Sequence, residues 1–316
     1  MGPPTIAGPI VHRSPWEVDR HDPRYGHGQH AIDSAEAAEA LLLHESPLEG
    51  LRRVFSSPDY HPPPLPSVAL RVHELTKRPD VPMGEVVGLI ERDAMLAAEV
   101  LRLAQSPFYA TKVPPQSLDD VAARLGLNTL RNLVWEVAAG RVFKVPAYQP
   151  AMENLRAHSV AVARLSRLVS SYTAVNAEQA FLCGLLHDVG WVACLLALAE
   201  GARSRGAAPP ALADVVDEVG TIHGEAGATV ARLWSLPGDL GLVLEHHHDP
   251  RIQGFVHPLS AVVAIANDLA VERGAGLDLS LQDGPRDLVE APVLGLARDA
   301  LDLDDGKLAA IVDQAA

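Results

Sequence analysis

The stretch "GLLHDVGW", Gly184–Trp191, places a histidine and an aspartate next to each other at the end of an apolar run. One interpretation is an ordinary helix terminus, in which Gly190 supplies the left-handed conformation of a C-cap. The other is a metal site. An adjacent imidazole and carboxylate can both bind metal at a helix end, because the carboxylate can bridge two ions while the imidazole holds one. For this stretch alone, both interpretations stay open.

Helical periodicity dominates the chain on both sides of this stretch. Apolar residues recur at spacings of three and four in "GEVVGLIERDAMLAAEVLRLAQS". "SLDDVAARLGLNTLRNLVWEVAAG" begins with Ser117 as an N-cap and is interrupted at Gly126. Further helices are expected at about 151–172, 177–198, 210–219, 223–234, 238–247 and 258–273, with one or two more in the tail. Strand-like alternation is hard to find, so we predict an all-α, multi-helix globular bundle.

Proline clusters divide the chain. "SSPDYHPPPLP" cannot continue a helix, which predicts an N-terminal extension over residues 1–60. The extension contains one expected helix, "DSAEAAEALLLHE", capped by Asp33 or Ser34, and it is either a tether or a segment that folds on binding a partner. We expect a main domain at 61–275, with an N-terminal helical subdomain at about 61–148 and a second subdomain at about 149–275. Residues 276–316 are predicted to form a helical tail packed on this domain.

Composition restricts the classes of function. The formal net charge of −14 argues against tight binding of duplex nucleic acid, and an aromatic content of 4% argues against base-stacking platforms. The start of the chain lacks the features of a signal peptide, and the longest apolar run, "WVACLLALA", is far shorter than a membrane span. The two cysteines, Cys183 and Cys194, are typical of a reducing compartment. We therefore expect a cytoplasmic protein without membrane insertion.

The histidines carry the strongest functional signal. Besides the opening stretch, His158 lies in "LRAHSVAVARL", His223 in "TIHGEAGATVARLW", and three consecutive histidines in "EHHHDP". Imidazole and carboxylate groups from several helices can converge on one cation, and this ligand type favours Zn, Mn, Fe or Ni over Ca or Mg. The alternative is structural. A lone histidine on a helix is usually an ordinary hydrogen-bonded residue, and "HHHDP" alone equally fits a solvated helix C-terminus.

Taken in order, the sequence blocks resemble one known family. These blocks are "LP" at Leu65–Pro66, "LIERDAMLAAEVLRLAQSPFY", "SLDDVAARLG", "AHSVAVARLSRL", "AFLCGLLHDVG", "HGEAGATVARLWSLP" and "HHDP". The chain resembles the HD-related output domain, HDOD, of bacterial signalling proteins over about residues 60–275. Two departures are mild: Ala94 stands where the family usually has proline, and Gln105 where it usually has asparagine.

The resemblance implies a set of metal ligands, because this family is related to HD-superfamily phosphohydrolases and their cyclic-dinucleotide phosphodiesterase branch, HD-GYP. The positions that match ligands of that branch are His158, His187, Asp188, His223, His247 and His248. One or two divalent ions of Fe, Mn or Zn are the implied cofactors. The last ligand of the pattern is an aspartate, and the best match is Asn267, with Asp268 one position beyond. A shift of one residue turns a side chain by about 100° around a helix, which places Asp268 poorly.

Two departures weaken the implication of catalysis, so we assign no catalytic residue. Trp191 stands where related phosphohydrolases commonly carry lysine, and indole cannot neutralise a substrate phosphate. The "GYP" sequence of the phosphodiesterase branch is also missing. The resemblance implies a non-catalytic signal-transduction module that contacts signalling proteins, with a vestigial or structural metal site. The alternative is a metal-dependent phosphohydrolase or phosphodiesterase acting on a nucleotide or cyclic dinucleotide, which keeps a nucleotide ligand open.

The loop "SPFYATKVPP" offers a second place for partner contact. Phe108 and Tyr109 lie beside prolines, where aromatic side chains can serve either docking or core packing. Core packing is the interpretation that we favour for both.

Overall fold

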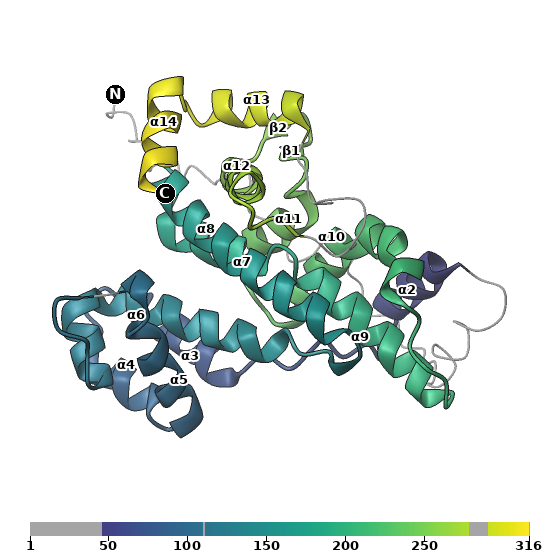
Figure 1. Ribbon diagram of the computed structural model, residues 1–316, viewed down its shortest axis with the longest axis horizontal. Coiled ribbons are helices and arrows are strands. Elements are labelled where there is room, and N and C mark those ends of the chain that lie inside the picture. Colours follow the sequence, from purple (N-terminus) through teal and green to yellow (C-terminus); the bar gives the residue numbers. More distant parts are fainter. Residues whose placement is uncertain (1–45, 110, 278–289, 316) are drawn as a thin grey trace, which may run out of the picture. The chain divides into compact units, whose positions relative to one another are not determined.

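The helical periodicity of the sequence is reproduced in the computed structural model, which describes residues 46–109, 111–277 and 290–315 (Figure 1). The prediction of an all-α fold with an N-terminal helical subdomain is confirmed. The helix expected at 33–45 lies outside the described residues, as does part of the predicted tail.

The first group of helices packs mainly within itself. It comprises α3 (Ser67–Leu75), α4 (Met83–Ile90), α5 (Ala94–Ala104), the short 3-10 turn η2 (Pro107–Tyr109) and α6 (Leu118–Val142). The expected cap is present, since Ser117 Oγ accepts a hydrogen bond from Asp120 N at 3.1 Å. The expected interruption is also present. Gly126 has φ 83°, a left-handed value that kinks α6 where most other residues would be strained.

The second group carries the histidines. It comprises η3 (Pro146–Tyr148), α7 (Gln149–Ser170), α8 (Ala177–Leu186), α9 (Val189–Ser204), η4 (Leu212–Asp214), α10 (Val216–Leu233), α11 (Gly238–His246) and α12 (Pro258–Glu272). Helices α7 and α8 lie side by side, α9 packs on α10, and α12 packs on α7 (Figure 1). Contacts of α6 with α7 and α8 join the two groups.

A small hairpin and two further helices complete the described chain. Strands β1 (Arg251–Ile252) and β2 (Phe255–Val256) pair antiparallel, with Arg251 opposite Val256. Helix α13 (Ala291–Ala300) packs on α12 and on β2, and α14 (Asp305–Gln314) follows it. The region 276–316 thus contains two described helices, and the domain boundary at residue 276 stays a prediction.

Three of the expected helices differ from those observed. The helix expected at 177–198 is divided into α8 and α9 by a turn at His187 and Asp188. Conversely, the helices expected at 210–219 and 223–234 are largely one, α10. Helix α10 continues through its glycines, and Gly224 is a site of close packing: a Cβ there would lie 3.1 Å from the carbonyl oxygen of Glu245 on α11.

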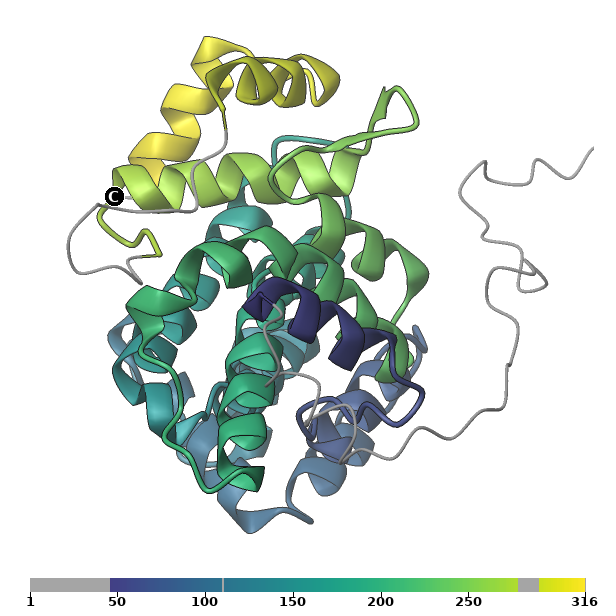
Figure 2. The ribbon, with the colours of Figure 1, turned by 90° about the vertical axis from the view of Figure 1, so that its right-hand side faces the viewer.

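Helix α2 (Pro47–Ser56) lies in the region predicted as an extension and was not expected from the sequence. Its N-cap is Ser46, and Leu51 and Phe55 are buried. It packs on α9 and α10, which Figure 2 shows as the dark helix beside the green ones. Apolar packing therefore continues N-terminal to the proline cluster, while the boundary at residue 60 stays a prediction.

Almost all buried apolar side chains form one contiguous core through both groups of helices. The segment Ala177–Ser204, which contains α8 and α9, is long and apolar enough to cross a membrane by length and composition. However, 89% of its most apolar window is buried inside the fold, as in a core helix. Cys183 and Cys194 lie in this segment, and both are buried free thiols.

His73 makes the stability of this fold sensitive to acid. Its ring lies edge-on to Trp135 with centroids 5.8 Å apart, and both ring nitrogens are buried without a hydrogen-bond partner among the described residues. Burial, followed by repulsion from Lys77 and Arg131, lowers the pKa of His73 to about 4. Between that value and about 6.5, the unfolded chain binds a proton that the folded chain does not. The free energy of unfolding should therefore fall as the pH drops through this window.

We expect a His73→Leu variant to lose this part of the pH dependence. Urea denaturation at pH 7 and near pH 4.5 measures it, because the unfolding free energy of the variant should fall less on acidification than that of the wild type. His61, an exposed histidine, provides the control through His61→Leu, which should keep the wild-type slope. Equal slopes for His73→Leu and the wild type would contradict the assignment.

Candidate metal centre

The turn that divides α8 from α9 is the centre of the site. His187 is the C-cap of α8, Asp188 is the N-cap residue of α9, and both side chains are fully buried. His158 reaches them from α7, with its Nε2 atom 3.2 Å from His187 Nε2 and 3.7 Å from Asp188 Oδ2. His187 Nε2 lies 3.2 Å from the same carboxylate oxygen. These three residues form the first trio.

A second trio faces the other oxygen of Asp188. His223 comes from α10, His247 is the C-cap of α11, and His248 follows it. His223 Nε2 lies 3.2 Å from His247 Nε2 and 3.1 Å from His248 Nε2. Asp188 Oδ1 lies 3.6 Å from His223 Nε2 and 3.5 Å from His247 Nε2. Within each trio the ligand atoms lie within 4.8 Å of one another, so the cluster can hold a metal ion.

Backbone carbonyls set the orientation of four of the rings. His187, His223 and His247 each place Nδ1 2.6–2.8 Å from the carbonyl oxygen three residues earlier. His158 Nδ1 lies 2.7 Å from the carbonyl oxygen of Ala275. A carbonyl only accepts, so each Nδ1 carries a proton, and in the neutral form of each ring the lone pair of Nε2 points into the cluster. Lone pairs that face one another at about 3.2 Å fit a cation between them.

Burial keeps the imidazole of His247 neutral. Burial, with a smaller effect of the neighbouring His248, lowers the pKa of His247 to about 3. A neutral imidazole is the form that binds metal, and the buried carboxylate of Asp188 provides negative charge at the centre. The donor set of imidazole nitrogens and one shared carboxylate suits Zn, Mn or Fe.

Trp191 covers the second trio. Its ring stacks on His223 with centroids 5.3 Å apart and planes at 28°, and it is 3% exposed. The indole also packs on α10 at Gly220, where a Cβ would lie at an ordinary contact distance of 3.6 Å from the ring. In the sequence, Trp191 indicated only the missing lysine, and its stacking on His223 could not be predicted from local pattern.

The structure brings together all six residues that the resemblance implied. It also distinguishes the two candidates for a last ligand. Asn267 on α12 is fully buried, whereas Asp268 is partly exposed and belongs to neither trio. Burial raises the pKa of Asp268, with a contribution from Glu272. The interpretation of "HHHDP" as a solvated terminus is wrong for His247, which is fully buried.

The two aromatic residues of the loop after α5, both expected in the core, differ in burial. Tyr109 is buried, and its hydroxyl donates to Glu136 Oε1 at 2.8 Å. Phe108 is 59% exposed, and the Arg164 guanidinium lies 3.8 Å from its ring centroid. Core packing is therefore correct for Tyr109 and wrong for Phe108.

Comparison with known proteins agrees with this geometry. The family model of the HDOD domain matches residues 63–250, more than half of the chain. The chain belongs to the HDOD family. Among solved structures, an HDOD domain protein of Geobacter sulfurreducens is 29% identical, with a TM-score of 0.61 over 84% of this chain and 92% of that one. Another solved structure is a Shewanella amazonensis SB2B protein that is provisionally named a metal-dependent phosphohydrolase. It is 22% identical, with a TM-score of 0.63 over 89% of this chain and 97% of that one, and this likeness concerns the fold alone.

Curated relatives of the HDOD chain are longer proteins. An uncharacterized protein of Treponema pallidum (strain Nichols) is 29% identical over 213 residues, which are 65% of this chain and 41% of that protein. Ribonuclease Y of Mycoplasma mycoides is 25% identical over 166 residues, 51% of this chain and 34% of the enzyme. The chain thus spans less than half the length of either relative.

Proposed function

We propose that this HDOD protein is a cytoplasmic signalling module that binds two divalent metal ions in its His/Asp cluster and does not hydrolyse phosphate esters. One ion would be held by His158, His187 and Asp188. The other would be held by His223, His247, His248 and the same aspartate. Bound ions of this type can lower the pKa of a coordinated water, which is the chemistry that the related hydrolases use.

The observation that carries the proposal is the burial of the cluster. Five of its six residues are 5% exposed or less, and only His248 is more accessible. A catalytic metal needs an open coordination position that a substrate can reach, whereas a structural site is closed by protein ligands. Trp191 occupies one side of the cluster, and it brings no positive charge for a phosphate. A buried cluster therefore supports a metal that stabilises the fold or has a regulatory role over a metal that acts on a substrate.

A module without turnover acts through its surface. Phe108 gives the first group of helices one exposed aromatic contact, and the acidic chain favours partners with basic surfaces. We propose signalling proteins as these partners, and a cytoplasmic location is supported by the two free thiols.

The protein should therefore bind metal and should not hydrolyse phosphate esters. The experiment purifies the chain without a metal-binding tag, measures metal content by mass spectrometry, and incubates the loaded protein with phosphomonoesters, nucleotides and cyclic dinucleotides. The expected result is bound Fe, Mn or Zn and no phosphate or linear product.

The matched control for this experiment is Asp188→Ala. Turnover by the wild type that disappears in Asp188→Ala would overturn the non-catalytic proposal and establish the phosphohydrolase alternative. Turnover that persists in Asp188→Ala would identify a contaminating enzyme. A well-folded wild type without metal would refute the metal-binding part.

A further inference from the structure

A small hollow of about 270 Å³ opens between α5, the end of α6 and the start of α7, away from the residues of the His/Asp cluster. Its floor is apolar and includes Leu103, Phe143 and Met152. Its charged lining residues are Glu99, Arg102, Arg141, Lys144, Glu153 and Arg156. Four cations against two carboxylates give the lining a net charge of +2, in a chain whose formal net charge is −14.

The cations of this hollow are unevenly matched with acids. Arg141 is neutralised on its own side, with Nη1 2.8 Å from Asp93 Oδ2 and Nε 3.4 Å from Glu99 Oε2. In the described parts of the chain, no hydrogen bond or ion pair joins the side chain of Arg102, Lys144 or Arg156 to another group. Like charges gathered around one hollow repel one another, so an anion placed there would stabilise the arrangement.

Gly140 gives Arg156 its position. A Cβ at Gly140 would lie 2.9 Å from Arg156 Nε and 3.5 Å from its Cζ, so the guanidinium rests on the backbone of α6. The three atoms nearest to this Cβ all belong to the Arg156 side chain, so alanine at position 140 would displace the guanidinium. The glycine thus leaves room for a cation at the hollow, and replacing it by alanine changes geometry without changing charge.

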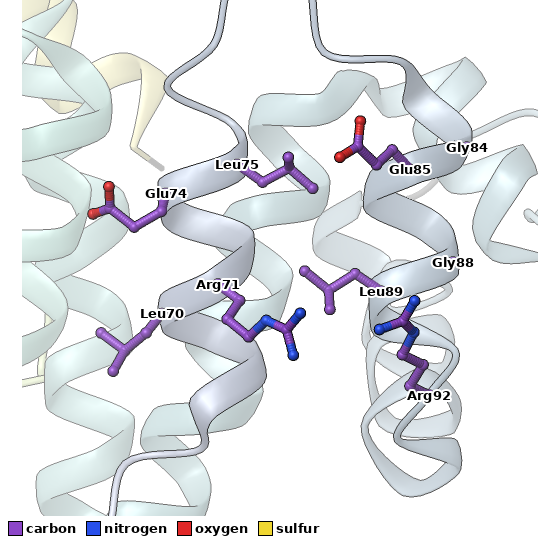
Figure 3. A pocket seen from close by; sticks show the side chains of 9 residues that line it. All are labelled: Leu70, Arg71, Glu74, Leu75, Gly84, Glu85, Gly88, Leu89 and Arg92. Carbon is purple, nitrogen blue, oxygen red and sulfur yellow. The ribbon is translucent and has the colours of Figure 1, made fainter.

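A second, larger groove has equal numbers of positive and negative lining residues and serves as a comparison. The cavity of about 680 Å³ between α3 and α4 is lined by Arg71, Arg92, Glu74 and Glu85, with Leu89 among its apolar residues. Figure 3 shows the two arginines toward one end of this groove and the two glutamates toward the other. Two cations and two carboxylates give this groove no net charge, so it has no comparable preference for anions.

We propose that the hollow at Arg102, Lys144 and Arg156 is a binding site for a small phosphate-bearing molecule with two or more negative charges. Guanidinium groups match phosphate oxygens in paired hydrogen bonds, and a lysine adds a point charge. The volume accommodates a phosphate or diphosphate group. The strongly acidic chain repels long polyanions, which favours a compact ligand over nucleic acid. The site is independent of metal in the His/Asp cluster.

Calorimetric titration with inorganic phosphate, pyrophosphate and AMP at constant ionic strength tests the proposal. Because pyrophosphate also chelates metal, the titrations use metal-free full-length protein. We expect saturable binding by the wild type, weakened about tenfold or more by Arg156→Ala or Lys144→Ala, since each removes a charge-assisted hydrogen bond. Binding of AMP but not of inorganic phosphate would identify the ligand as a phosphorylated metabolite. Binding of inorganic phosphate but not of AMP would identify it as the free anion.

Two variants separate this site from a general effect of charge. Gly140→Ala keeps every charge and should still weaken binding several-fold, because it displaces Arg156. Arg71→Ala removes the same charge from the α3–α4 groove and should leave affinity unchanged. An equal loss in Arg71→Ala and Arg156→Ala would overturn the proposal, as would the absence of saturable binding to the folded wild type. Neither outcome bears on the metal centre.

Discussion

Replacing Asp188 by alanine should remove both metal ions, whereas replacing a histidine of one trio should remove mainly one. Asp188 places one carboxylate oxygen against each trio, with Oδ2 toward His187 and Oδ1 toward His247. Each ion would lose a charged ligand in Asp188→Ala. Losing even an outer-shell partner of a metal ligand typically costs about 10–100-fold in metal affinity, and a directly bound carboxylate is worth at least as much.

The single-histidine variants make this prediction specific. In His158→Ala, only the first trio is broken, so metal content should fall by about one ion per chain and the remainder should stay with the second trio. His247→Ala should give the converse result. Metal analysis by mass spectrometry after dialysis measures all three variants against the wild type.

Loss of fold is the main confounding effect, so Asp188→Asn serves as a second variant. The amide keeps the volume and shape of the carboxylate and removes its charge. Circular dichroism should show helical variants, and added metal should raise the melting temperature of the wild type but not of Asp188→Asn, because binding to the native state alone stabilises it. Two ions retained in a folded Asp188→Ala protein would contradict the shared role of Asp188.

Helical segments could be predicted from the sequence because apolar spacing and caps are local signals. Ser117 and Gly126 mark the start and the kink of α6 in the sequence as clearly as in the structure. The turn at His187 and Asp188 could not be predicted in this way, since "LLHDVGWVACLL" keeps its apolar character throughout. What interrupts this helix is the placement of two polar side chains toward groups on α7, α10 and α11, which is tertiary information.

The candidate ligands were found by resemblance rather than by local pattern. Their convergence depends on five helices, α7 to α11, and on the carbonyls that orient the rings, such as that of Ala275 to His158, 117 residues away in the chain. The loop after α5 shows the same limit: Phe108 was expected in the core and is exposed, with the Arg164 guanidinium of α7 over its ring. That neighbour lies far away in the sequence.

Gly190→Ala should be among the most destabilising single substitutions in this fold. An ideal Cβ at Gly190 would lie 1.7 Å from the carbonyl oxygen of His223, 2.6 Å from its carbonyl carbon and 2.8 Å from Gly227 N. All three are backbone atoms of α10, so no rotation of a side chain relieves the clash, and α9 and α10 must separate. Overpacking of a core costs about 1–3 kcal/mol and occasionally more. A contact of 1.7 Å with backbone belongs at or above the upper end of that range.

The measurement is urea denaturation followed by circular dichroism, with Gly241→Ala as the matched control. Gly241 lies within α11, and a Cβ there meets nothing within 4 Å, so alanine should be neutral or stabilise by up to about 1 kcal/mol through its higher helix propensity. Separation of α9 from α10 would also move His223 away from Asp188. Any folded Gly190→Ala protein should therefore bind less metal at the second trio. An unfolding free energy equal to that of Gly241→Ala would contradict the prediction, because it would show that α9 and α10 have room for the added methyl group.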